Sequence, residues 1–215
     1  MNNGVGFNPE QVNFCIESLK KSYEELIVLL GDGVQNNIVN ELSDKWASNQ
    51  AISFFNDVFK TSFDSLLISI NAVFERVISV VISEAQLWAN RTDTIYIAPE
   101  FVQINKMIDV SLIRENINGV RGIDLESSRS VLSKLPSIVE STNTILNQAQ
   151  QSVLNSGFIG GSQSDNLYSL LGSVKTNVQN SIQDVISQFN NSVQSTITGY
   201  SDTAGLISNM FASIV

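Results

Sequence analysis

Histidine, the side chain that most often performs acid–base chemistry, does not occur in this 215-residue sequence, and cysteine occurs once. The sequence therefore lacks the commonest general base and the commonest zinc ligand. Cys15 lies in "VNFCIESL", on the apolar face of a predicted helix. A buried and inert thiol is expected there rather than a reactive one, and a single cysteine cannot form an internal disulfide.

A glycine-rich stretch, "GFIGGSQSD" at residues 157–165, precedes a predicted helix. Phosphate-binding loops occupy this position because the N–H groups at a helix N-terminus attract anions. Here no Gly-Lys-Ser/Thr follows, and the first lysine after the loop is Lys175. We therefore interpret residues 157–161 as a turn that uses the backbone freedom of glycine.

Acidic residues form three pairs on predicted helices: Glu24 with Glu25, Glu41 with Asp44, and Asp57 with Asp64. A metal site would need further oxygen ligands from elsewhere in the chain. Without histidine or a converging partner, we interpret these carboxylates as solvated helix faces. The sequence therefore predicts no catalytic, cofactor-binding or metal-binding residues, and the protein is not expected to be an enzyme.

The composition limits the classes of partner. The chain is 43% hydrophobic and only 15% charged, and Asn, Ser, Gln and Thr fill most polar positions. The net charge is −9 and basic residues do not cluster, so we expect no binding to nucleic acid or to anionic membranes. The segment "MNNGVGFNPEQ" lacks the regions of a signal peptide. Polar residues interrupt the apolar run 66–82, which we expect to be buried in a bundle rather than in a membrane.

Hydrophobic periodicity predicts two long helical segments in the first half of the chain. Asn8 can cap a helix whose first residue is Pro9, and "GDG" at 31–33 is expected to break or kink it. A second helix is predicted from about residue 50 to about residue 90. Its apolar residues recur every three or four positions: Phe59, Phe63, Leu66, Ile70, Val73, Val77 and Val81.

The following region, 93–122, is predicted to be a connector. "TIYIAPEFV" alternates and favours extended structure, and a short helix is expected near 100–116. Helical periodicity returns at Asp124, a candidate cap, and Pro136 is expected to kink the helix or begin a new first turn. After the turn at 155–165, another helix is predicted over 164–200.

The two halves of the chain align at a constant shift of 112 residues. Trp46 then corresponds to Phe158 and Trp88 to Tyr200. Many apolar positions of both helices coincide, although Phe63 falls on Lys175, Leu30 on Thr142 and Ile38 on Gln150. We infer a tandem duplication of a helical hairpin. The predicted fold is all-α: two tandem antiparallel helical hairpins form an elongated four-helix bundle. Hairpin 1 spans 1–92, a partly extended connector 93–122, and hairpin 2 with an apolar C-terminal tail 123–215.

A helix, a turn with an aromatic residue and a longer helix resemble the WXG family, the helical-hairpin proteins exported by type VII secretion. The family's turn carries Trp-x-Gly. Here the first turn reads Trp46-Ala47-Ser48, without the glycine, and the second reads Phe158-Ile159-Gly160, without the tryptophan. The family's Tyr-x-x-x-Asp/Glu export motif is not matched, since Tyr200 is followed four residues later by Ala204. The resemblance implies the hairpin shape and, as an alternative function, a secreted or partner-binding protein.

The favoured function is a non-enzymatic structural subunit of a multi-copy particle, such as a virion, assembled by helix packing with other protein subunits, including copies of itself. An aromatic residue at a hairpin turn either caps its own bundle or reaches a groove on a partner. An apolar chain end docks either on its own bundle or on a neighbour. The predicted interaction residues are Trp46, Phe158, Trp88, Tyr200, Leu206, Ile207, Met210 and Phe211.

Overall fold

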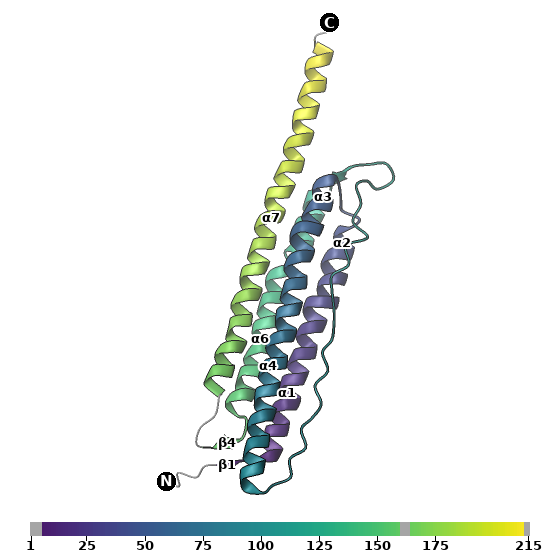
Figure 1. Ribbon diagram of the computed structural model, residues 1–215. Coiled ribbons are helices and arrows are strands. Elements are labelled where there is room, and N and C mark those ends of the chain that lie inside the picture. Colours follow the sequence, from purple (N-terminus) through teal and green to yellow (C-terminus); the bar gives the residue numbers. More distant parts are fainter. Residues whose placement is uncertain (1–5, 160–163, 213–215) are drawn as a thin grey trace.

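The computed structural model describes residues 6–159 and 164–212, with the backbone alone for Ile159 and for 203–212. The described chain is mostly helical, so the all-α prediction is confirmed. Four long helical segments lie side by side in a bundle, and an extended segment runs along one side of it (Figure 1). Two-residue strands pair at each end of the bundle.

The first helical segment begins where the sequence predicts. The Asn8 side chain accepts hydrogen bonds from the N–H groups of Glu10 and Gln11, and α1 runs over Pro9–Ile27. The segment continues through two π-helical stretches, η1 (Val28–Gly33) and η2 (Gln35–Val39), into α2 (Asn40–Leu42). The glycines of "GDG" therefore do not end the helix but lie where its turns widen.

The second segment follows a short turn that contains β2 (Trp46–Ala47). The Ser48 hydroxyl accepts a hydrogen bond from the Ala51 N–H and caps α3 (Asn49–Ser53). The helix continues through η3 (Phe54–Lys60) and α4 (Thr61–Thr92). The helix predicted over residues 50–90 is thus confirmed. It ends at Asp93, whose φ of 54° lies in the left-handed region that terminates helices.

Residues 94–113, which we call the strap, contain no helix; the segment is extended up to a turn at 111–112. The expectation of a short helix near 100–116 is therefore wrong, for a reason of length. The helix Asn49–Thr92 has 44 residues, or about 66 Å at 1.5 Å per residue. The chain returns along this whole length before it begins the third segment (Figure 1), and only an extended chain of about 3.3 Å per residue covers that distance in so few residues.

The third segment begins after β3 (Gly122–Ile123). Asp124 caps α5 (Leu125–Leu132) as predicted, and α6 (Leu135–Leu154) begins with Pro136 in its first turn. After β4 (Phe158–Ile159) the last helix, α7, covers Ser164–Ala212. This helix is longer than the predicted 164–200, and in Figure 1 its ribbon continues well past the end of the other helices.

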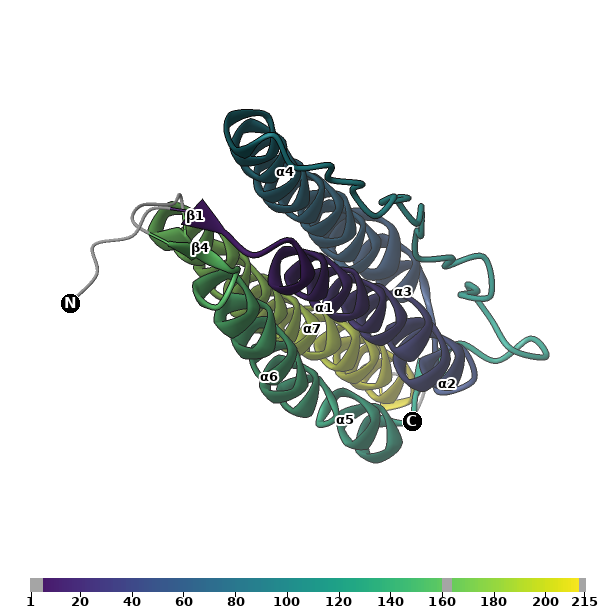
Figure 2. The ribbon, with the colours of Figure 1, turned by 90° about the horizontal axis from the view of Figure 1, so that it is seen from below.

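The packing order places α1 beside both α4 and α6, and α7 beside both α4 and α6, as the end-on view also shows (Figure 2). At one end of the bundle β1 (Gly6–Phe7) pairs with β4, and at the other end β2 pairs with β3, both antiparallel. The apolar stripes of all four segments meet in one core. Because the strap lies over α1 and α4, these two helices are covered from outside as well.

Candidate interaction surfaces

The side chains that could perform chemistry are separate from one another. Cys15 is buried, and burial raises the pKa of its thiol to about 12, so it stays protonated and unreactive at neutral pH. Among the described residues, no group of three or more histidine, cysteine, aspartate or glutamate side chains is close enough to hold a metal ion. Of the predicted acidic pairs, Glu25 forms an ion pair with Lys21, Glu41 forms one with Lys134, and Asp64 has the buried arrangement described below.

The glycine-rich loop is described only in part, because residues 160–163 lie outside the described chain. Gly157 has a φ of +85°, and a Cβ at this position would lie 2.7 Å from the Cβ of Gln11. Its carbonyl accepts a hydrogen bond of 2.9 Å from the Asn8 N–H. Glycine is therefore required at position 157, because the turn before β4 crosses closely over the start of α1. This agrees with the interpretation of the loop as a turn.

Trp46 lies fully buried in the chain's own core. Its ring centroid lies 5.6 Å from that of Phe54 and 5.5 Å from that of Phe189, which comes from α7. In this chain Trp46 therefore packs between the first turn and the last helix. The indole N–H is buried without a hydrogen-bond partner.

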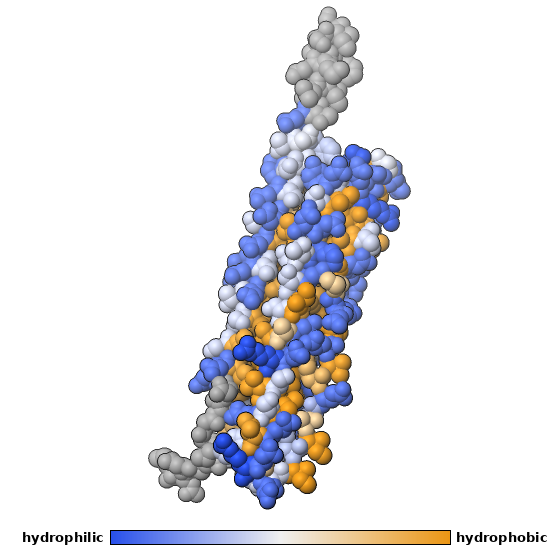
Figure 3. All heavy atoms as spheres, in the orientation of Figure 1, coloured by the Kyte–Doolittle hydropathy of each residue, from blue (hydrophilic) through white to orange (hydrophobic). Residues whose placement is uncertain are grey.

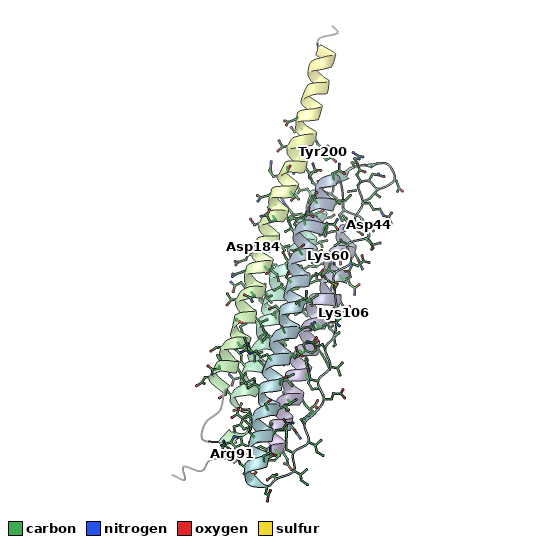
Figure 4. All side chains as sticks on the ribbon, viewed as in Figure 1. Asp44, Lys60, Arg91, Lys106, Asp184 and Tyr200 are labelled. Carbon is green, nitrogen blue, oxygen red and sulfur yellow. The ribbon has the colours of Figure 1, made fainter. Side chains whose placement is uncertain are left out.

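The other predicted interaction residues lie in different environments. Phe158 is half-buried in β4 opposite Phe7, and Trp88 is half-buried near the end of α4. Tyr200 is 43% exposed and lies where α7 leaves the bundle, as labelled in Figure 4. The side chains of Leu206, Ile207, Met210 and Phe211 lie outside the described part of the structure, although the backbone there is helical.

Three positions of the strap are held by side chains that bind its backbone. The Tyr23 hydroxyl accepts a hydrogen bond from the Ile104 N–H and donates one of 2.7 Å to the Asn71 Oδ1. The Asn71 amide donates to the Ile104 carbonyl at 3.4 Å. Tyr23 belongs to α1 and Asn71 to α4, so this contact ties the strap to both helices.

The second and third contacts follow the same principle. The Asp64 carboxylate accepts a 2.7 Å hydrogen bond from the Ile108 N–H, while Lys60, its ion-pair partner, donates to the Ile108 carbonyl at 2.8 Å. At the next residue, Gln35 binds both the N–H and the carbonyl of Asp109, each at 2.8 Å. We call these three contacts the strap clamps. They satisfy backbone groups of the strap that neither helix nor sheet pairing satisfies, and the N–H of Ile108 is buried among them.

The strap also alternates between the core and the surface. Tyr96, Phe101, Ile104, Ile108 and Val110 face inward and pack on the core. The outward apolar residues, which we call the strap ridge, are well exposed: Ile95 89%, Ile97 80%, Val102 67%, Met107 64% and Leu112 42%. Figure 3 shows apolar surface along the side that carries the strap. Large exposed apolar residues that share one face are typical of contact surfaces.

The strap clamps are not predicted by the sequence. The alternation in "TIYIAPEFV" indicates an extended segment, but it does not reveal what the segment packs on. Tyr23, Asn71, Asp64 and Gln35 look like ordinary helix positions in the sequence. Three of these are polar residues within apolar stripes, and that pattern is the one signal that could have marked them as buried and partnered.

Among the residues that the structure describes, one helical segment, Asn49–Thr92, is long and apolar enough to cross a membrane by length and composition alone. In the most apolar window of this helix, 44% is buried inside the bundle. A core helix has the same composition, and this helix packs against α1 and α7. The length and apolar composition of this helix are therefore only weak evidence for a membrane span.

Comparison of the chain with family models, curated proteins and solved structures finds no match.

Proposed function

We propose that this protein is a non-enzymatic structural subunit of a multi-copy particle, a virion or a similar complex, that associates with copies of itself or with other subunits by helix packing. The observation that carries the proposal is the length of α7. The helix continues to Ala212, past the end of the bundle (Figure 1). The sequence of this extension is apolar and contains Leu206, Ile207, Met210 and Phe211.

Spacing supports the role of the extension. Residues 206, 207, 210 and 211 are separated by one, three and one positions, a pattern that keeps them on one side of a helix. A helix with such a side is stable in water only when another surface covers it. Since the other helices end earlier, a second chain is the natural source of that surface.

The described surface of α7 also favours packing against other chains. Among residues 164–202 the charged side chains are Asp165, Lys175, Asp184 and Asp202. The other exposed positions carry mainly Asn, Gln, Ser and Thr. Uncharged polar groups cost less to bury at a subunit contact than charged groups do. The strap ridge, on another segment of the chain, offers a second apolar contact surface.

We further propose that the bundle is a tandem pair of helical hairpins. The strand pairing supports this, because it is reciprocal. β1, which precedes the first helix, pairs with β4 in the second turn, and β2 in the first turn pairs with β3, which precedes the second half. An exchange of the two halves about a twofold axis preserves this pattern.

The strand registers refine the constant shift of 112 residues. Trp46 and Phe158 keep it, but the reciprocal partners Phe7 and Ile123 differ by 116. Four more residues therefore lie between strand and turn in the first half than in the second. The π-helical stretches η1 and η2 lie in this part of the first half, and each wide turn takes up extra residues. Leu42 is buried while Leu154 is 45% exposed, so the gap-free pairing of these two residues fails.

The test is the state of association of the full chain and of a chain that ends at residue 203. Analytical ultracentrifugation over a range of concentrations should show oligomers for the full chain and monomers for the shortened one. A full-length variant with serine at Leu206, Ile207, Met210 and Phe211 keeps the length of α7 and should also be monomeric. Unchanged association in both variants, or a strictly monomeric full chain at high concentration, contradicts the proposal.

The alternative is a secreted or partner-binding protein that resembles the WXG family. The feature that favours it is Trp46 at the turn between two long helices. Genes that neighbour the coding sequence separate the two functions. Capsid or tail genes support the particle, whereas a type VII secretion ATPase supports the alternative.

A further inference from the structure

A shallow groove of about 650 Å³ lies between the first helical segment and α6. Val28, Leu29 and Ile145 form its apolar floor. Val28 is 56% exposed, although it is a large apolar residue in the interior of a long helical segment. The groove is lined from Glu24 to Asn36 along the first segment, a length of about 18 Å or three helical turns.

Local structure explains why the groove is open. The lining includes η1, whose π-helical turns are wide, together with Gly33 and the small side chain of Ser141 on α6. A Cβ added at Gly33 would have its nearest neighbour at 3.5 Å, so space for a side chain exists there. The two helices thus pack without filling the groove between them.

The charges that line the groove have one sign. Glu24, Glu25 and Asp32 line it, and no lysine or arginine does. Lys21 pairs with Glu25 at 3.8 Å and is 79% exposed, whereas Lys106 pairs with Asp32 at 2.7 Å from the strap side. Glu24 has no ion pair among the described residues. The protein as a whole carries a charge of −9, so its field reinforces the local one.

We propose that this groove binds an amphipathic helix of another protein whose apolar stripe is flanked by lysine or arginine. An apolar floor with charged edges is the arrangement with which proteins hold such helices, and complementary charge selects the partner. A second copy of this chain does not fit, because the sequence of its apolar C-terminal extension, 201–215, includes Asp202 and no lysine or arginine. The groove is therefore a contact distinct from the one proposed for self-association.

The probe is a fluorescein-labelled synthetic helix of about 18 residues, or five turns, with leucine at every third or fourth position and lysine at the flanking positions. Fluorescence anisotropy with the full-length protein measures its affinity. A peptide with glutamate in place of lysine, and one with serine in place of leucine, should each bind at least about tenfold more weakly. Equal binding of the glutamate peptide overturns the proposal.

Variants of the protein locate the binding site. Glu24→Gln with Glu25→Gln should weaken binding about tenfold, whereas the control pair Glu126→Gln with Asp184→Asn, exposed acids that do not line the groove, should change it less than about twofold. Equal loss in both pairs shows that net charge alone attracts the peptide and overturns the proposal.

Filling the groove gives an independent test. Gly33→Leu should weaken binding about tenfold, and Gly33→Ala, with much less bulk, should leave it within about twofold. Val28→Ser, at an exposed position, tests the floor even if Gly33→Leu does not fold, which circular dichroism reveals. Full binding by folded Gly33→Leu and Val28→Ser places the peptide elsewhere and refutes the assignment. Loss of self-association on removal of 204–215 is a separate outcome, because it does not alter this groove.

Discussion

The side-chain amide of Gln35 binds both polar groups of the Asp109 backbone: its Nε2 donates to the carbonyl and its Oε1 accepts from the N–H, each at 2.8 Å. A neighbouring β-strand would pair with the N–H and the carbonyl of one residue in the same way; here a single side chain from the π-helical stretch η2 makes both hydrogen bonds. Together with the clamps at Ile104 and Ile108 it makes the strap part of the bundle rather than a loose linker. The strap in turn lets the chain cross from one end of the bundle to the other.

Gln35→Ala should therefore loosen the strap. The variant removes two hydrogen bonds and leaves the Asp109 groups to find water, so we expect a loss of about 1–2 kcal/mol in the free energy of unfolding. Lys106 and Arg114, two tryptic sites in or next to the strap, should be cleaved faster. Urea denaturation and timed trypsin digestion measure the two effects.

The control for this prediction is Gln148→Ala, at an exposed position of α6. It should change neither the midpoint of unfolding nor the cleavage at Lys106 and Arg114. If Gln35→Ala also leaves both unchanged, the clamp does not hold the strap in solution.

Asp64 and Lys60 form the clamp with the largest expected effect. Asp64→Ala leaves the Ile108 N–H and the Lys60 ammonium without their carboxylate partner, whereas Asp64→Asn keeps one oxygen for the N–H. We expect Asp64→Ala to cost about 2–3 kcal/mol and Asp64→Asn clearly less. Urea denaturation of the two variants gives the comparison. Equal destabilisation would show that the ion pair, not the hydrogen bond to the strap, is what matters.

Much of the helical fold could be predicted from the sequence, because helix boundaries depend on local signals. Asn8 and Asp124 are side chains that cap a helix wherever its first turn begins, and the stripe from Phe59 to Val81 requires a buried face. The connector was harder, since its conformation depends on residues far away in the sequence. A helix near 100–116 is locally plausible, but the strap clamps from α1, η2 and α4 stabilise the extended form.

The surfaces show the same division. Tyr200 lies just beyond the apolar stripe that the sequence shows up to Ile197, and it is exposed. The buried position of Trp46 against Phe189, in contrast, depends on how α7 crosses the first turn. The groove beside Val28 could not be predicted, because it arises from π-helical turns opposite a small residue on α6. Each of these features depends on tertiary packing, which periodicity alone does not specify.

Trp46 should be a major contributor to stability. Trp46→Ala leaves a large cavity among Phe54, Phe55 and Phe189, and we expect a cost of about 3–5 kcal/mol. Trp46→Phe keeps an aromatic ring and removes an indole N–H that has no partner, so its cost should not exceed about 1.5 kcal/mol. Urea unfolding followed by circular dichroism measures both. A similar loss in both variants would mean that the indole N–H is satisfied in solution.

Asp124 predicts a pH dependence of stability. Hydrogen bonds from the Ser127 hydroxyl and from the Ser127 N–H lower the pKa of this carboxyl below its ordinary value of 3.8. The folded-state pKa is therefore below the unfolded one, and the stabilisation is complete above pH 3.8 and lost as the pH falls through the folded value. Asp124→Asn caps α5 without titrating. Thermal melts should show that the wild-type protein loses its advantage over this variant on acidification; a constant difference between pH 7 and pH 2.5 contradicts the prediction.

Gly33 and Gly157 should respond in opposite directions to alanine. Gly33 lies in a helical segment, where a Cβ would meet its nearest neighbour at 3.5 Å, so Gly33→Ala should stabilise the protein by about 0.5–1 kcal/mol by reducing the freedom of the unfolded chain. Gly157 has a φ of +85°, and a Cβ there would lie 2.7 Å from the Cβ of Gln11. Gly157→Ala should therefore destabilise by about 2 kcal/mol or more. Urea denaturation of the two variants, with the wild-type protein between them, tests both signs; a stabilising Gly157→Ala would show that the crossing of β4 over the start of α1 is looser than its contacts imply.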